Sequence, residues 1–317
     1  MDQTRTQDIV RHIMKDDDKG ISMMEKLSLD DAVSVMTQVL PALKNQAKER
    51  NSSNDYQYFS TAENIYRKVL VDKLKQEEHL WVVYSDTTSY PYMLDDDLIL
   101  VYNPSNTAKI SEKLEKSGYA VSMGGEDGST LMHEISHMYR NGYKNVRVTD
   151  GDKKMYSIPR EDFASYDEFF DDEYITNPGF QNAMISYFQE FRKKSIDGIN
   201  DILSTRESLM LASMKNAEFM VPCVKEETDD EISIAHHFID VTERVEHKEG
   251  EQVIAIPAFT DGFEMDKCYE GHHENMLYTF SELVSSVEEL SASGVIFNAL
   301  GISYFMPIDT LKKIAKG

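Results

Sequence analysis

Cysteine is nearly absent from this sequence of 317 residues, which contains only Cys223 and Cys268. Neither belongs to a Cys-x-x-Cys pair, and two cysteines make no disulfide framework. No run of 18 apolar residues is present, which argues against a bilayer-spanning helix. The first 20 residues include three consecutive aspartates and lack the apolar core of a signal peptide. We therefore expect a soluble, cytoplasmic protein.

Positive charge is also scarce. Lys and Arg number 33 against 56 Asp and Glu, which gives a formal net charge of −23 and a sequence pI near 4.7. Binding to nucleic acid or to an anionic membrane surface needs clustered cations, so this composition argues against both kinds of partner. It does not exclude cations, basic peptides or metals as ligands.

The pattern of apolar residues changes along the chain, whose length suits two domains of roughly 100–200 residues. Residues 1–52 carry apolar positions at helical spacing and predict an N-terminal helical segment. Residues 55–165 and 201–317 alternate short β-rich runs with amphipathic helices, which is typical of α/β units with a mixed or parallel sheet, with α+β as the alternative. Residues 166–200 are acidic and aromatic, and we interpret them as a helical connector, either a plain linker or a partner-binding segment.

The two α/β segments end in a shared pattern that indicates an internal duplication. In each segment a tyrosine, an aliphatic residue, a proline and an apolar residue stand at offsets 0, 2, 3 and 7. These residues are Tyr156, Ile158, Pro159 and Phe163 in the first segment, and Tyr304, Met306, Pro307 and Leu311 in the second. The pattern predicts a β-hairpin whose last strand leads into a proline-started helix, with the apolar residue packed back onto the sheet.

The last third of the chain carries a series of landmarks in a distinctive order. They are Leu209-Met-Leu-Ala-Ser-Met214, Ala217-Glu-Phe-Met-Val-Pro222, Ile256-Pro-Ala-Phe-Thr-Asp261, Phe280-Ser-Glu-Leu283, Gly294-Val-Ile-Phe-Asn298 and Leu311-Lys-Lys-Ile314. With these landmarks, residues 206–317 resemble the N-terminal domain of the enhanced-serine-sensitivity (SseB) family. The sequence departs from the family's usual pattern at Ala299, where the family often has proline, and in the long acidic excursion 225–250.

The resemblance implies a small α/β domain with a poorly defined molecular role and no agreed active site. Residues 60–163 look like a diverged copy of the same domain. We therefore expect two tandem SseB-like units in a non-catalytic protein-interaction or regulatory protein without a cofactor.

One motif points to a different function. His133-Glu-Ile-Ser-His137 places two histidines at i and i+4 on one helical face, where they can bind zinc, and Glu134 can act as general base on a zinc-bound water. A third ligand has to come from downstream, for example from Glu161, Glu168 or Asp171. The alternative function is thus a zinc-dependent metallohydrolase. If the motif is structural instead, Leu131, Ile135 and Met138 face the sheet and both histidines face water.

The other polar groups have ordinary interpretations. We expect surface loops at His236-His237 and His272-His273-Glu274, and solvated turns at Asp95-Asp-Asp97 and Thr228-Asp-Asp-Glu231. Gly124-Gly-Glu-Asp-Gly128 lacks the lysine and hydroxyl residue of a phosphate-binding loop. Cys223 follows Pro222 in a predicted strand and is interpreted as a buried, inert thiol.

The N-terminal helices are the expected docking site for a partner protein or for self-association. Their apolar residues lie on one side at helical spacing, and they are Met24, Leu27, Val33, Met36 and Leu40. A third function stays open beside the interaction protein and the hydrolase. It is a small-molecule sensor or effector with a pocket between the two units.

Overall fold

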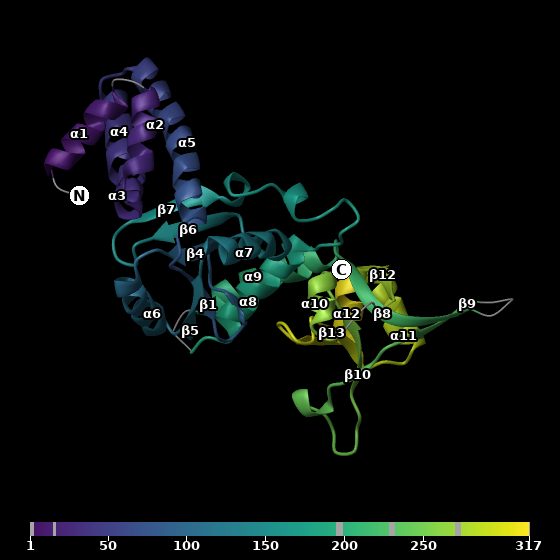
Figure 1. Cartoon of the computed structure of the whole chain (residues 1–317). Coiled ribbons are helices and arrows are strands. Elements are labelled where there is room, and N and C mark those ends of the chain that lie inside the picture. The colour runs from purple at the N-terminus through teal and green to yellow at the C-terminus, as the bar shows by residue number, and fades with distance from the viewer. Residues whose placement is uncertain (1–2, 15–16, 195–198, 228–231, 270–273, 317) are drawn as a thin grey trace. The chain divides into compact units, whose positions relative to one another are not determined.

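The computed structural model describes residues 3–14, 17–194, 199–227, 232–269 and 274–316 (Figure 1). The acidic cluster 228–231 and the pair His272-His273 lie outside these residues. Contacts divide the chain into two units. The first consists of residues 1–85, 91–138 and 143–169, and the second of residues 86–90, 139–142 and 170–317. No helix of the described residues is long and apolar enough to cross a membrane.

The first unit begins with helices that pack on one another. They are α1 Gln3–Ile13, α2 Asp17–Lys26, α3 Leu29–Ser34, the π-helix Val35–Val39, α4 Leu40–Glu49 and α5 Ser53–Lys75. Ser28 caps α3 by accepting a hydrogen bond from the backbone N–H of Asp31 at 3.2 Å, as its sequence position predicts. The predicted docking residues of these helices are Met24, Leu27, Val33, Met36 and Leu40. All five are at most 8% exposed, because they form the core between the helices, so their proposed role as a docking face is wrong.

A mixed sheet follows these helices. Its strands are β1 Leu80–Ser85, β2 Tyr90–Pro91, β3 Met93–Leu94, β4 Asp97–Val101, β5 Val121–Glu126, β6 Asn145–Thr149 and β7 Met155–Pro159. Their order is β2-β1-β4-β6-β7, with β5 paired to β1 and β3 paired to β4. The β4–β6 pair is parallel, and the helices α6 Thr107–Lys116 and α7 Gly128–Asn141 lie between these two strands in the chain. An α/β architecture with mixed sheets is therefore confirmed.

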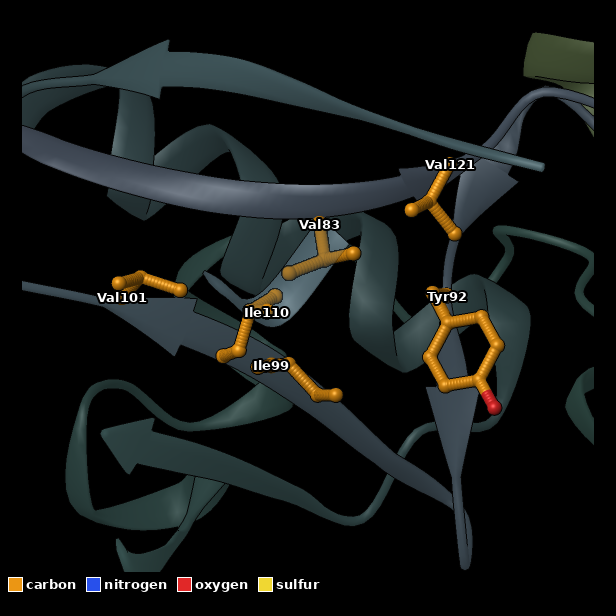
Figure 2. Close-up of a cluster of buried hydrophobic side chains, with 6 residues drawn as sticks. All are labelled: Val83, Tyr92, Ile99, Val101, Ile110 and Val121. Atoms are coloured by element: carbon orange, nitrogen blue, oxygen red, sulfur yellow. The ribbon is translucent and has the colours of Figure 1, made fainter. Parts of the chain in front are cut away.

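Branched apolar side chains hold α6 against one face of this sheet. Figure 2 shows the cluster, in which Ile110 of α6 meets Val83, Ile99, Val101, Tyr92 and Val121. All six side chains are at most 8% exposed. Alternate residues of a strand share one face, so Ile99 and Val101 reach this cluster together.

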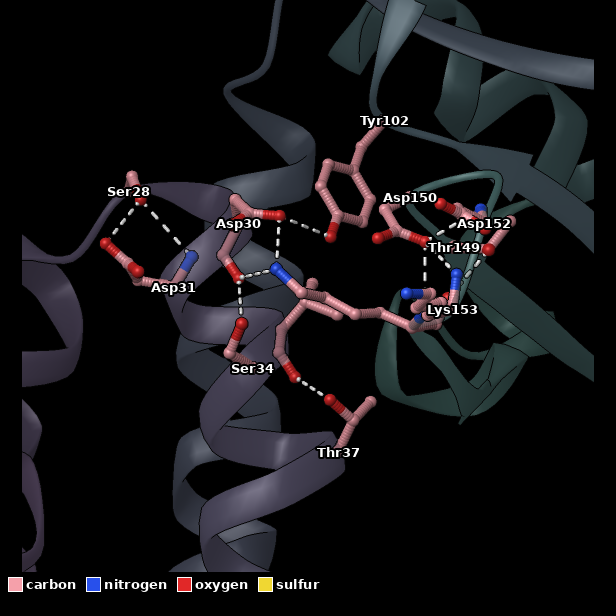
Figure 3. A network of polar contacts seen from close by, with 12 residues as sticks. Ser28, Asp30, Asp31, Ser34, Thr37, Tyr102, Thr149, Asp150, Asp152 and Lys153 are labelled. Atoms are coloured by element: carbon pink, nitrogen blue, oxygen red, sulfur yellow. Dashed lines mark hydrogen bonds and ion pairs between the residues drawn. The ribbon is translucent and has the colours of Figure 1, made fainter. Parts of the chain in front are cut away.

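Lys154 and Asp30 connect the N-terminal helices to the sheet (Figure 3). Asp30 of α3 accepts hydrogen bonds from Lys154 at 2.5 Å and from Tyr102 at 3.0 Å. Tyr102 follows β4, and Lys154 belongs to the turn between β6 and β7. The carboxyl ends of the parallel strands β4 and β6 are thus close to polar groups of α3.

The second unit contains two small sheets. One has the order β12-β8-β9 and the other β10-β11-β13-β14, with an isolated bridge between Met220 and Phe259. The strands are β8 Glu218–Glu227, β9 Ile232–His236, β10 Ile239–Asp240, β11 Ile254–Ala258, β12 Asn275–Thr279, β13 Gly294–Phe297 and β14 Tyr304–Pro307. The helices are α8 Pro178–Phe191, α9 Ile199–Met214, α10 Gly262–Asp266, α11 Phe280–Glu289 and α12 Ile308–Lys316.

The strand pairings repeat between the units. In each unit a parallel pair, β4–β6 or β11–β13, is extended by an antiparallel hairpin, β6–β7 or β13–β14. Pro159 pairs with the first residue of β6, and Pro307 pairs with the first residue of β13. In each unit another antiparallel pair, β1–β5 or β8–β12, supplies a further strand. This shared order is what an internal duplication produces.

Two segments of the chain differ from what the sequence predicts. The proline-started helix is α12 in the second unit but only a 3-10 turn, Arg160–Asp162, in the first. Its apolar residue is buried in both, since Phe163 is 3% and Leu311 is 0% exposed. Helix α8, assigned to the connector, belongs to the second unit, where Phe180, Met184 and Ile185 are buried. It is part of that unit's core.

Candidate functional site

Polar side chains gather at the carboxyl ends of the parallel strands β11 and β13. Thr260 and Asp261 come shortly after β11, and Asn298 comes directly after β13. Carboxyl ends of parallel strands are the usual place for ligands in open α/β sheets. All three residues are 0% exposed. We call the group formed by Thr260, Asp261, Asn298, Gln181, Glu264, Tyr90 and Arg140 the polar centre. All of its residues belong to the second unit.

A buried ion pair organises one side of the polar centre. Arg140 donates to Asp261 Oδ1, and the two residues are 2% and 0% exposed. The same carboxylate caps α10 by accepting from the backbone N–H of Glu264 at 3.1 Å. The Arg140 guanidinium also lies 4.1 Å from the centre of the Phe263 ring. A buried charge is tolerated only with partners of this kind, so both members of the pair are held in place.

The side-chain amides of Asn298 and Gln181 hold the other side of the polar centre in place. Asn298 Nδ2 donates to Gln181 Oε1 at 2.8 Å and to Thr260 Oγ1 at 3.0 Å, while Asn298 Oδ1 accepts from the Thr260 N–H at 3.0 Å. Asn298 has a φ of +46°, which asparagine tolerates better than most residues. Gln181 comes from α8, so this helix closes the polar centre.

Three buried polar atoms of the centre lie close together. Glu264 Oε1 accepts from Lys267 at 2.7 Å, whereas Glu264 Oε2, the Tyr90 hydroxyl and Gln181 Nε2 have no hydrogen-bond partner among the described residues. A Cβ atom on Gly301 would lie 2.5 Å from both Glu264 Oε2 and the Tyr90 hydroxyl. Burial, and then the charge of Glu264, raise the pKa of Tyr90 far above its usual range. Tyr90 is therefore a neutral phenol that lies beside the carboxylate of Glu264 and the amide of Gln181.

The predicted zinc motif lies on α7 in the first unit. The rings of His133 and His137 have centroids 4.1 Å apart, and His137 Nδ1 is 3.9 Å from Glu134 Oε1. His133 is exposed and His137 is partly buried. Leu131, Ile135 and Met138 are buried, as the structural interpretation of the motif expects, but its expectation that both histidines face water is wrong for His137, whose Nε2 is buried. Sequence spacing therefore identified correctly which histidines come together.

The described residues do not assemble a third zinc ligand. Among the residues that the structure describes, no group of three His, Cys, Asp or Glu side chains is placed to hold a metal ion, so Glu161, Glu168 and Asp171 do not complete a site. Glu134 instead faces Tyr84, whose pKa is raised by burial and then by Glu134 and Glu126. Gly124 makes room for this tyrosine, since a Cβ there would lie 2.4 Å from the Tyr84 ring.

Three other polar residues singled out in the sequence make contacts within the fold. Asp97 is 2% exposed and binds Arg147 at 2.7 Å, so the expectation of a solvated turn is wrong for this residue. Burial raises the pKa of the Cys223 thiol, as expected for an inert cysteine. His236 Nε2 lies 2.7 Å from the Tyr278 hydroxyl, so this histidine packs on the β12-β8-β9 sheet and is not in a free loop.

Sequence reasoning did not find the polar centre. Asp261 appeared only as the end of a landmark, and Arg140 stands 121 positions away from it. No local spacing signals such a pair. A usable signal was the position of Thr260-Asp261 and Asn298 shortly after two β-rich runs.

The chain was compared with protein-family models, curated proteins and solved structures. None of the three comparisons found a match.

Proposed function

We propose that this chain is a non-catalytic, cytoplasmic protein-interaction or regulatory protein, with two units related to the SseB domain. One observation carries this proposal, and it is the outward face of helix α9. Ile202 and Leu209 on this face are 47% and 59% exposed, while Met210 and Met214 on the opposite face are fully buried. The helix is therefore apolar on both sides.

The composition of the α9 face is unusual for this chain. We define the α9 face by the uncharged outward residues Ile202, Thr205, Ser208, Leu209 and Ala212; the exposed charged residues of this helix, Asp201 and Glu207, lie at its start and on another side. Arg206 is turned toward α8, where it donates to the backbone carbonyl of Ser186 at 2.8 Å. In a protein with 28% charged residues, an outward helix face with no charge between its two ends indicates a surface that another protein covers.

The polar centre supports the same proposal in a different way. Its Arg140–Asp261 pair and its Asn298–Gln181–Thr260 hydrogen bonds tie the polar side chains that follow β11 and β13 to other side chains of the fold. The net charge of −23 further argues against nucleic acid as the partner.

Substitution of Leu209 by aspartate tests the proposal. Leu300, in the turn after β13, is 60% exposed and provides a matched control outside α9. The wild-type protein and the Leu209→Asp and Leu300→Asp variants are used to capture partners from a native cell extract, and direct binding is then measured with each purified candidate. We expect a partner that is lost with Leu209→Asp and kept with Leu300→Asp. Identical binding by all three proteins contradicts the proposal.

A sensor function has one observation in its favour. The second unit contains a pocket of 470 Å³ lined by Tyr174, Ile175, Thr176, Asn177, Lys215, Asn216, Ala217, Glu218 and Thr279. Asn177 is fixed there by hydrogen bonds from its Nδ2 to the carbonyls of Glu218 and Thr260, at 2.6 and 2.7 Å. A thermal-shift screen with metabolites tests this alternative, because a ligand of the native state raises the melting temperature.

The zinc-dependent hydrolase is supported by the proximity of His133 and His137 alone. Catalytic zinc usually has three protein ligands and a water. The described residues supply two imidazoles here, which favours the interaction protein over the hydrolase.

A further inference from the structure

We infer that the α9 face binds a second copy of this chain, with the two α9 helices packed antiparallel about a two-fold axis near Ser208. This inference rests on the proposed interaction function and names its partner. It is carried by the charges at the two ends of the face.

The two ends of the α9 face have opposite charge. Asp201 lies in the first turn of α9 and Lys215 directly follows its last residue, and both side chains are exposed. Neither makes an ion pair within the part of the chain that the structure describes. The 14 positions between them correspond to nearly four helical turns, or about 21 Å, so both charges lie on the same side of the helix as Ser208. Between them the face is uncharged.

The charges of two α9 faces are complementary only when the two helices run antiparallel. In an antiparallel pair centred on Ser208, Asp201 of each copy lies opposite Lys215 of the other, and two equivalent ion pairs form. In a parallel pair the aspartates lie together and the lysines lie together, which is repulsive. The charge pattern therefore selects the antiparallel, two-fold arrangement.

The shape of the face fits the same arrangement. Thr205, Ser208 and Ala212 are small and lie near the axis, where they allow two helices to approach closely. A pocket of 450 Å³ lies at one end, lined by Ser208, Leu211, Ala212, Lys215, Asn216 and Ile314. Antiparallel packing brings the exposed Ile202 of the second copy to this pocket, and the reverse contact forms at the other end.

The dimer that results is weak. One helix pair covers less surface than a standard interface, so association depends on protein concentration. Sedimentation velocity over about a hundredfold range of concentration of the full chain measures it. We expect a monomer–dimer equilibrium for the wild-type protein and for Leu300→Asp, and a loss of dimer affinity of about a hundredfold for Leu209→Asp, which introduces two buried charges into the interface.

A charge exchange tests the antiparallel geometry. Asp201→Lys and Lys215→Asp each place like charges opposite one another, so each single variant weakens the dimer by about tenfold. The double variant with both substitutions restores opposite charges in the antiparallel pair and recovers the wild-type affinity. Circular dichroism of every variant confirms that the fold is kept.

The outcomes separate this inference from the proposed function. A wild-type protein that stays monomeric at every concentration overturns the inference, and so does a double variant as weak as the single ones. If the protein is monomeric but loses a captured partner with Leu209→Asp, the α9 face binds another protein and only the identity of the partner was wrong. If Leu209→Asp changes neither self-association nor capture, the proposed function fails as well.

Discussion

Lys154 Nζ lies 2.5 Å from Asp30 Oδ1, and this contact joins the N-terminal helices to the sheet of the first unit. Asp30 also accepts a hydrogen bond from Tyr102. Burial alone raises the pKa of Asp30, but the hydrogen bonds from Lys154 and Tyr102 outweigh it and lower that pKa below its ordinary value. The attachment of α3 to the sheet therefore depends on a charged carboxylate.

The attachment should weaken in acid. Because the pKa of Asp30 is lower in the folded state, its contribution to stability is fully present above the unfolded value of about 4 and is lost as the pH falls through the lowered value. We expect the free energy of unfolding of the wild-type protein to decrease more steeply than that of Asp30→Asn as the pH falls below about 4. Urea unfolding at a series of pH values measures this difference, and parallel curves for the two proteins contradict it.

Much of the fold was accessible from local sequence patterns. Two apolar, β-rich runs of the sequence, residues 80–84 and 98–102, coincide with β1 and β4, because continuous apolar residues fit strands that are buried on both faces. Ser28 predicted the start of α3. The matched Pro159 and Pro307 predicted the repeated hairpins, since proline removes a backbone donor and tends to end a strand.

The failures concern contacts between residues distant in the sequence. The apolar stripe around Met36 and Leu40 was read as a docking face, but helical periodicity does not tell whether the covering partner is another protein or α5 of the same chain. Asp97 was expected in a solvated turn and Asp261 had no assigned role, but the fold brings Arg147 to Asp97 and Arg140 to Asp261. Such pairings depend on tertiary structure, which spacing alone does not encode.

Gly301 should be intolerant of a side chain. A Cβ there lies 2.5 Å from Glu264 Oε2 and from the Tyr90 hydroxyl, and both residues are buried. These two side-chain atoms can move only by disturbing the polar centre. We therefore expect Gly301→Ala to destabilise the protein by about 1–3 kcal/mol. Gly179 in α8 has no atom within 4 Å of its Cβ position, which makes Gly179→Ala the control. Chemical denaturation should show the control to be neutral or slightly stabilised, and equal stability of the two variants contradicts the packing described for the polar centre.

The contributions of Arg140 and Asp261 to the free energy of unfolding should be strongly coupled. Arg140→Met leaves the Asp261 carboxylate buried without its counter-charge, which costs about 3–5 kcal/mol in free energy of unfolding. Asp261→Asn keeps the cap of α10, because asparagine caps helices about as well as aspartate. We therefore expect the double variant with both substitutions to be more stable than Arg140→Met alone. A double-mutant cycle from urea unfolding measures the coupling, and simple additivity of the two changes would show that the pair is not formed.

His133 and His137 should bind zinc weakly. Their rings lie together on α7, but two imidazoles provide fewer ligands than the three of a catalytic site. We expect calorimetric titration to detect zinc binding that disappears with His137→Ala, and we expect desalting to remove the metal from the wild-type protein. Elemental analysis after desalting checks the second point, with Ser136→Ala as the control because it changes the same helix and keeps both rings. Zinc retained at one equivalent by the wild-type protein and by Ser136→Ala, but lost with His133→Ala, would contradict the interaction function, because it requires a third ligand of the kind that a hydrolase needs.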